Sequence, residues 1–176
     1  EPDAVFYIPR LYINDGKGNF SLQKQAIPGS VKTIAGCVSA GDYDNDGDLD
    51  LFIGGRVSKN YPVCPRSFVL QNNKGVFTDV TESINAALKN PGMVTSALWT
   101  DIDNDKQVDL IIAGEWMPVR FFKNNHGKLE EITDQTGLTA NNGMWRSLVA
   151  ADYDNDGDMD IIAGNLGSNC EYHAST

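Results

Sequence analysis

Aspartates at alternate positions recur in three short windows of the sequence. The windows read DYDNDGDLD from position 42, DIDNDKQVD from position 101 and DYDNDGDMD from position 152. Each offers side-chain oxygens at its positions 1, 3, 5 and 9 and a main-chain carbonyl at position 7. Calcium takes six to eight oxygen ligands at about 2.3 to 2.6 Å, and no thiolate or imidazole lies in a window to favour zinc. We predict up to three calcium sites, with the candidate ligands Asp42, Asp44, Asp46, Asp48, Asp50, Asp101, Asp103, Asp105, Gln107, Asp109, Asp152, Asp154, Asp156, Asp158 and Asp160.

The middle window departs from the other two at its sixth position. Lys106 stands there in place of Gly47 and Gly157. The sharp turn favours a residue that tolerates a positive φ, and a residue other than glycine costs on the order of 1 kcal/mol there. The lysine ammonium also repels a cation. We therefore expect the site at 101–109 to be the weakest of the three.

The acidity of the chain is concentrated in these windows. The sequence has 24 acidic and 14 basic residues, a formal net charge of -10, and 14 of the acids lie in the windows. A nucleic-acid binder needs a basic face to neutralise phosphates, so we expect no nucleic-acid partner. No run of 18 apolar residues occurs, and we expect no transmembrane segment.

Strand patterns flank every window. Short apolar runs precede the windows, at 34–40, 93–99 and 144–150, and β-branched runs follow them, at 51–53, 110–112 and 161–162. Each window is therefore predicted to connect the strands of a β-hairpin. A second hairpin with an Asn- and Gly-rich turn is predicted at 68–80 and at 119–132, and a similar one opens the chain at 10–22.

The windows define an internal repeat with periods of 59 and 51 residues. Four antiparallel strands per period describe a propeller blade. We predict an all-β fold, namely a partial β-propeller arc of about three four-stranded antiparallel blades with calcium-binding hairpin loops. Within 1–176, taken as a fragment of one propeller, we expect the second half of a blade at 5–27, blades at 31–82 and 92–134, and the first half of a blade at 143–176. A closed propeller needs at least about four blades, so the remainder is expected to be missing; a complete small sandwich is the alternative.

The connections after the second strand of each unit should emerge together on the face away from the Asp windows. Aromatic residues beside Arg and Asn could contact a protein or glycan ligand there. The candidate partner-binding residues are Arg56, Tyr61, Arg66, Glu115, Trp116 and Asn165. In the alternative interpretation, Arg56 pairs with Glu115 and Trp116 packs between blades. We assign Trp99 and Trp145 to the core.

Catalysis finds little support in the sequence. Its two histidines, His126 in a hairpin turn and His173 near the end, have no convincing Ser or Cys partner. Glu115 and Glu131 give no reason to expect that they converge as a glycosidase pair. We therefore expect no enzyme. The cysteine count is odd, with Cys37, Cys64 and Cys170, and a Cys37–Cys64 disulfide stays open.

The windows, their preceding apolar runs and the Asn-rich hairpin with FTDV resemble the FG-GAP or VCBS repeat of the integrin α-chain type propeller. The segments GGRV, ALWTDIDND, GEWMP, FFKNNHGKLEEITDQTGL and GNLGSN more narrowly resemble bacterial VCBS proteins that carry an ASPIC/UnbV domain, related to cartilage acidic protein. The resemblance implies a propeller, usually of seven blades, with calcium loops on one face and adhesive loops on the other. It also implies that Asp48, Gln107 and Asp158 contribute their carbonyls.

We expect a non-catalytic calcium-binding module of a secreted or cell-surface protein that mediates protein or glycan binding, or adhesion. In a bacterium its location would be the periplasm or the extracellular side of the outer membrane, within a larger surface assembly. The alternative is the non-catalytic part of a polysaccharide lyase or hydrolase whose active site lies outside this fragment.

Overall fold

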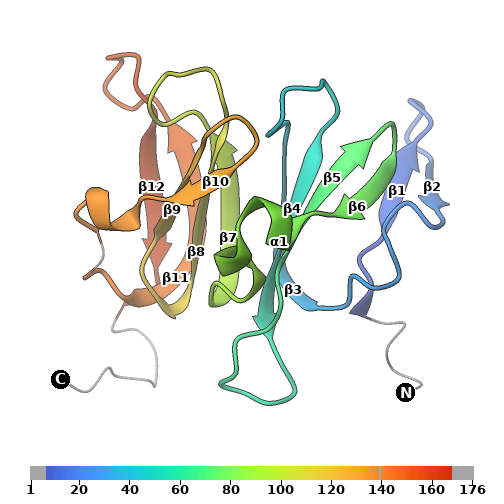
Figure 1. The fold of residues 1–176 in the computed structure, drawn as a ribbon, viewed down its shortest axis with the longest axis horizontal. Helices are drawn as coiled ribbons and strands as arrows, with labels where there is room; N and C mark the ends of the chain where they lie inside the picture. The colour runs from blue at the N-terminus through green and yellow to red at the C-terminus, as the bar shows by residue number, and fades with distance from the viewer. Residues whose placement is uncertain (1–6, 139, 168–176) are drawn as a thin grey trace.

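The structure is a computed structural model that describes residues 7–138 and 140–167. It is an all-β fold in which antiparallel sheets stand side by side along an arc (Figure 1). The strands are β1 (Leu11–Asn14), β2 (Phe20–Gln23), β3 (Ile34–Gly41), β4 (Asp50–Val57), β5 (Phe68–Asn73), β6 (Val76–Asp79), β7 (Met93–Thr100), β8 (Asp109–Met117), β9 (Arg120–Asn124), β10 (Leu129–Glu131), β11 (Gly143–Ala151) and β12 (Asp160–Asn165).

The strands pair in chain order, as expected of propeller blades. β3-β4-β5-β6 forms one four-stranded sheet and β7-β8-β9-β10 the next, while β1-β2 and β11-β12 are hairpins at the two ends of the arc (Figure 1). The arc does not close on itself. The prediction of a partial propeller arc is confirmed, and the sandwich alternative is not.

One pairing was not anticipated. β11 begins by pairing with the end of β8, with Gly143 opposite Met117 and Met144 opposite Glu115, before it pairs with β12. The last residue of β8 to pair with β9 is Ile112, so the end of β8 is available to another strand. The two sheets are therefore joined by main-chain pairing as well as by side-chain packing.

A separate hydrophobic core fills the space between each pair of neighbouring sheets. Successive residues of a strand point to opposite faces. In β4, Phe52 belongs to the core shared with the following sheet and Ile53 to the core shared with β1-β2. In β8, Leu110 faces the preceding sheet and Ile111 faces β11-β12. These strands read as continuous apolar runs because both of their faces are buried.

The first strand of each unit carries a β-bulge at the same place. The register shifts leave Gly36, Thr95 and Arg146 without a partner in β3, β7 and β11. A Cβ added to Gly36 would lie 2.1 Å from the carbonyl oxygen of Val94, so only glycine permits this approach of β3 to β7. The Thr95 hydroxyl donates to the carbonyl of Trp145 at 2.7 Å. The bulges thus bring successive first strands into contact.

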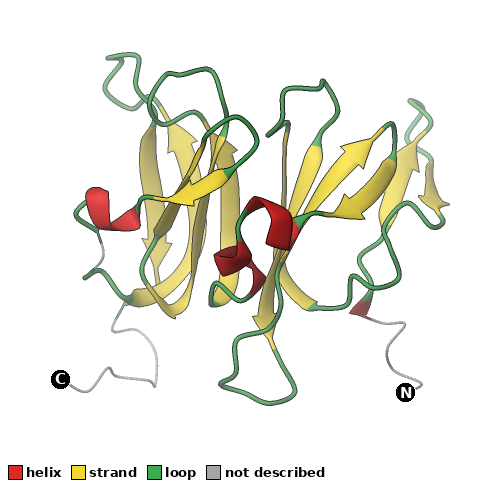
Figure 2. Cartoon of the chain, in the orientation of Figure 1, coloured by secondary structure: helices red, strands yellow, loops and turns green. Residues whose placement is uncertain are grey.

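Short helical turns follow the last strand of each complete sheet, and the sequence analysis did not predict them. They are α1 (Thr81–Ile84), η2 (Ala86–Lys89) and η3 (Thr133–Gln135) (Figure 2). The Thr81 hydroxyl accepts a hydrogen bond from the N–H of Val69, and the Thr133 hydroxyl accepts one from the N–H of Phe121. Each buried threonine therefore fastens its turn to the third strand of its own sheet.

Two tryptophans and two cysteines are partly buried in the described residues. Trp99 and Trp145 are half-buried against two different cores, and Trp99 stacks on Tyr43 with ring centroids 6.1 Å apart. Cys37 and Cys64 are both free thiols. The sequence left their pairing open, and Cys170 lies outside the described residues.

Candidate metal centres

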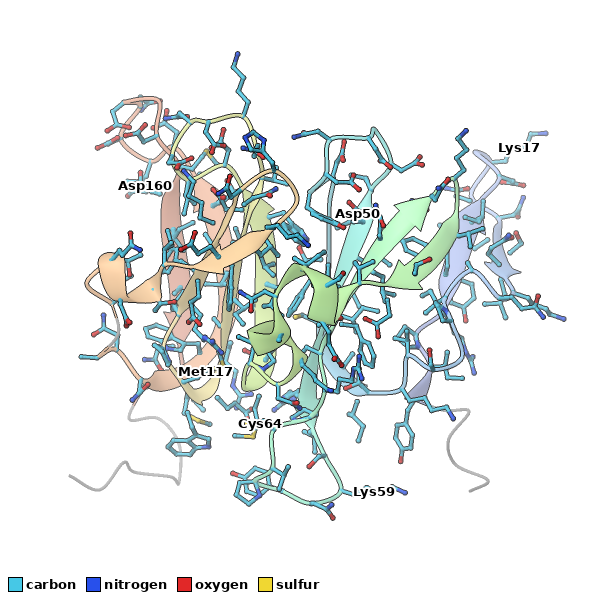
Figure 3. All side chains as sticks on the ribbon, viewed as in Figure 1. Lys17, Asp50, Lys59, Cys64, Met117 and Asp160 are labelled. Atoms are coloured by element: carbon cyan, nitrogen blue, oxygen red, sulfur yellow. The ribbon has the colours of Figure 1, made fainter. Side chains whose placement is uncertain are left out.

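The three Asp windows form equivalent loops on one face of the arc, where Asp50 and Asp160 are labelled in Figure 3. Each loop is entered and left at the same register, because Gly41 pairs with Asp50, Thr100 with Asp109 and Ala151 with Asp160. The hairpin strands therefore place the first and last acids of each window side by side.

The first aspartate of each loop shapes the loop through the main chain. Asp42 accepts hydrogen bonds from the N–H groups of Asp46 at 3.1 Å and Gly47 at 3.0 Å. Asp101 and Asp152 accept the same two bonds from the corresponding residues of their loops. The side chain satisfies main-chain donors that the turn leaves without a main-chain partner.

Two positions in each loop have a left-handed backbone. The sixth position has φ of 91° at Gly47, 70° at Lys106 and 96° at Gly157, as the sequence analysis predicted. The fourth position also has a positive φ, between 58° and 62°, and is always asparagine: Asn45, Asn104 and Asn155. The invariant Asn between the second and third acids was the signal for this feature, since asparagine tolerates the left-handed region better than most residues.

Three carboxylates converge in each loop, from positions 1, 3 and 9. One oxygen from each lies within 4.8 Å of the others in the triads Asp42-Asp44-Asp50, Asp101-Asp103-Asp109 and Asp152-Asp154-Asp160. The acids at position 5 are outside the triads, and one oxygen of each accepts the N–H of position 7, at Asp46, Asp105 and Asp156. That these acids and the position-7 carbonyls complete the ligand set stays a prediction.

The aspartate at position 9 is fully buried in the first two loops. Asp50 accepts from the N–H of Tyr43 at 3.1 Å and of Asn72 at 2.7 Å, and Asp109 has the same arrangement with Ile102 and Asn124. Burial raises the pKa of Asp50 to about 6 despite these bonds, and it raises the pKa of Asp109 as well. Asp160 is exposed and, among the described residues, accepts only from Tyr153.

The Asn-rich turns of the second hairpins support these acids, a role that sequence reasoning missed. The Asn72 amide donates to the carbonyl of Leu49, and the Asn124 amide donates to the carbonyls of Val108, at 3.1 Å, and Tyr43, at 2.6 Å. Asn124 is fully buried, and its bond to Tyr43 reaches the preceding loop. Sequence reasoning explained these asparagines by turn geometry alone.

The side chains at position 7 form hydrogen bonds with residues outside the triads. Asp48 accepts from the N–H of Lys74, and Gln107 accepts from the N–H of His126, both at 2.8 Å. Asp158 instead accepts from the Asn104 amide and so joins the second loop to the third. These side chains are thus engaged elsewhere, and the contribution of the position-7 main-chain carbonyls to a metal site stays a prediction.

The donor set of the first loop fits calcium. One carboxylate oxygen of Asp44, Oδ1, is buried and has no hydrogen-bond partner, beside the buried acid Asp50. A buried carboxylate oxygen without a partner is costly unless a cation balances it. The three acids supply only oxygen, which suits a hard cation.

The model of the FG-GAP-like repeat family matches residues 7–53 and 101–163, more than half of the chain. The chain belongs to the FG-GAP-like repeat family. No curated protein matches it. FG-GAP repeats often bind calcium, are generally non-catalytic structural modules and typically occur in extracellular proteins. No helix among the described residues is long and apolar enough to span a membrane.

The acids at position 3 of the first two loops, Asp44 and Asp103, differ in their neighbours. Gln71 of β5 donates its amide to Asp44 Oδ2 at 2.6 Å. The equivalent residue of β9 is Lys123, whose ammonium contacts Asp103 and lies 3.4 Å from Asp105 Oδ2. Sequence reasoning named Lys106 as the ammonium beside this loop and missed Lys123, which lies 20 residues from Asp103 and is brought in by the sheet.

The opposite face of the arc carries Lys59, Cys64 and Met117 (Figure 3). Near it, Arg56 of β4 donates from Nη2 to Glu115 Oε1 of β8 at 2.7 Å, and Arg146 of β11 donates to the same oxygen at 2.5 Å. The ion pair between Arg56 and Glu115 that the sequence analysis considered is present. It bridges three successive sheets, and Arg146 was not anticipated as its third member.

The remaining candidate partner-binding residues are scattered over different environments. Arg66 turns away to Asp79, at 2.9 Å, and lies over the ring of Phe68. Asn165 pairs with Trp145 at the end of β12. Tyr61 and Trp116 are 62% and 42% exposed, so these two present aromatic surface to solvent. Residues 168–176, including Asn169 and His173, lie outside the described residues.

Proposed function

We propose that this FG-GAP chain is a calcium-binding β-propeller module whose loops 42–50, 101–109 and 152–160 hold the ions. The observation that carries the proposal is the convergence of three carboxylates within 4.8 Å in each loop. The partnerless, buried Oδ1 of Asp44 supports it independently. When calcium is bound, its charge balances the carboxylates and stabilises the loops. Without the ion, the carboxylates repel one another.

A calcium titration of the chain by calorimetry tests this function. We expect Asp44→Asn to weaken one binding step at least tenfold, because it removes a charged ligand with a free oxygen. The matched control is Asp48→Asn, whose side chain bonds Lys74 and whose carbonyl is retained, so the same step should stay within about threefold. Chelation should lower the melting temperature, since a site at a hundred times its Kd adds about 2.7 kcal/mol to the free energy of unfolding. Equal binding by both variants would refute the assignment of the first loop.

We further propose that the module is secreted or displayed at a cell surface and binds a protein or glycan through the face opposite the calcium loops. Tyr61 and Trp116 support this, because they are 62% and 42% exposed, and solvent-exposed aromatic side chains are common binding anchors. A place in a larger bacterial surface assembly, and kinship with VCBS proteins carrying ASPIC/UnbV domains, are parts of the same proposal. Nothing in the described residues favours the alternative of a lyase or hydrolase accessory part.

A glycan array and a binding assay against extracellular matrix proteins, each with calcium, test the binding role. We expect the Tyr61→Ala, Trp116→Ala double variant to lose signal at least tenfold. Tyr153→Ala is the matched control, since Tyr153 is 77% exposed but belongs to the third calcium loop. Loss of signal in the Tyr153 variant alone would place the binding surface on the face of the calcium loops and contradict the proposal.

A further inference from the structure

Lys123 brings a fixed positive charge into the second calcium loop. It extends from β9, and its ammonium bonds Asp103 and lies 3.4 Å from Asp105 Oδ2. Asp103 is one of the three converging acids of that loop. A lysine ammonium is charged at neutral pH and donates up to three hydrogen bonds, so it can neutralise part of the carboxylate cluster without a metal.

The first loop has no such charge at the same place. Its Gln71 donates a neutral amide to Asp44 Oδ2, and Asp44 Oδ1 is left buried and without a partner. The two acids are equivalent by position in the loop, and the two neighbours are equivalent by position in the third strand. At this place the two loops differ by an ammonium in place of an amide.

The rest of the second loop accentuates this difference. It has four aspartates with Gln107 at position 7 and Lys106 at position 6, whereas the first loop has five aspartates and no basic residue. Calcium that enters the second loop must share Asp103 with Lys123 or displace it. Because like charges a few ångströms apart repel, either event lowers the affinity for the ion.

We propose that Lys123 is the built-in counter-ion of loop 101–109, so that this loop keeps its shape without calcium while loop 42–50 depends on the ion. The inference rests on the proposed calcium function of the first loop. The two neighbouring repeats then differ in their response to calcium: the first loop needs the ion to keep its shape, and the second does not.

Reciprocal exchange of the two neighbours tests the proposal. We expect Lys123→Gln to tighten the weakest calcium-binding step at least tenfold in calorimetry, and Gln71→Lys to weaken a tight step by a similar factor. Lys123→Arg, which keeps the charge, should leave the weak step weak. Lys106→Gly relieves the left-handed backbone but leaves Lys123 in place, so it should tighten that step less than Lys123→Gln does.

Lys128→Gln is the control for net charge, because the Lys128 ammonium bonds the carbonyl of Ser83, which lies outside the three Asp loops. Its calcium affinities should match those of the unmodified chain. If Lys123→Gln leaves every binding step unchanged while calcium still binds elsewhere, the inference is wrong and the proposed function stands. If no variant binds calcium at all, the proposed function fails first.

Hydrogen exchange in the presence of a chelator gives a second readout that needs no bound ion. In the unmodified chain, the amides of Asp105 and Lys106, which bond Asp101, should be protected more than those of Asp46 and Gly47. Lys123→Gln should abolish this excess protection, at least tenfold in rate, and added calcium should restore it. Equal protection of the two loops without calcium would overturn the proposal.

Discussion

At the scale of single residues, the loops depend on side chains whose neighbours decide what they can do. Asp44 and Asp103 occupy the same position, yet one has a buried oxygen without a partner and the other bonds an ammonium. Cys37 shows the same dependence, because it packs beside Gly54 and against the core between two sheets. Its chemistry is set by burial and not by its position in a motif.

The Cys37 thiol should resist ionisation in the folded chain. Burial raises its pKa from 9.0 to about 11. Because the folded state holds the proton more tightly, the stability from this group is complete below about pH 9 and is lost as the pH rises toward 11, with a slope of up to about 1.4 kcal/mol per pH unit. The free energy of unfolding of the unmodified chain, minus that of Cys37→Ala, should therefore fall between pH 9 and pH 11.

Alkylation with iodoacetamide at pH 9, followed by peptide mass analysis, provides the direct check. The thiolate is the reacting form, so Cys37 should be modified several-fold more slowly than Cys64. Denaturation should equalise the two rates. Equal rates in the folded chain would show that Cys37 is not protected.

At the scale of elements, the second hairpin of each sheet completes the loop formed by the first hairpin. The main-chain N–H groups of Asn72 and Asn124 bond Asp50 and Asp109, and the asparagine side chains bond the carbonyls just before those acids. Each of the first two Asp loops is therefore supported by three strands of its sheet. The third loop has only β11 and β12 beside it among the described residues, and the acid at its position 9, Asp160, is exposed.

The two asparagines should differ in their contribution to stability. Asn124→Ala removes two amide donations and one bond accepted from Gly127 at a fully buried position, and we expect a loss of about 3 kcal/mol. Asn72→Ala, the matched control in a more exposed turn, should cost about 1 kcal/mol. Urea denaturation of both variants measures the difference. Equal losses would mean that the bond from Asn124 to Tyr43 contributes nothing.

At the scale of the whole molecule, the arc is held together by cores between the sheets and by one charged cluster that spans three of them. Glu115 of β8 is the shared acceptor for Arg56 of β4 and Arg146 of β11. The Glu115 side chain is 11% exposed, whereas the two guanidinium groups remain partly in solvent. The cluster therefore links strands of three successive sheets through one carboxylate.

Removal of the shared carboxylate should destabilise the arc. Glu115→Gln leaves two guanidinium groups close together without their counter-charge, and we expect a loss of about 2 kcal/mol. Glu131→Gln is the control, because Glu131 is 32% exposed and its ion pair, with Arg120 at 2.6 Å, lies within one sheet; its loss should be below about 1 kcal/mol. Denaturant unfolding at low and high salt checks both. A smaller effect at Glu115 than at Glu131 would contradict a role in joining the sheets.

The sequence by itself determined the antiparallel blades and the outline of the Asp loops. The Asp windows repeat with apolar runs on both sides, and short apolar runs around a fixed turn favour a hairpin, so the hairpins and the left-handed sixth position could be read directly. The helical turns after β6 and β10 were missed because each depends on a threonine that bonds a strand about twelve residues away.

Only the tertiary structure decided which residues surround each loop. Lys123, Asn72 and Asn124 come from the neighbouring hairpin, and Arg146 reaches Glu115 from another sheet, at separations that no local pattern encodes. The windows specify carboxylates because ligand spacing is local. Whether an amide or an ammonium faces those carboxylates is a matter of sheet register, and the electrostatics of each site follow from it.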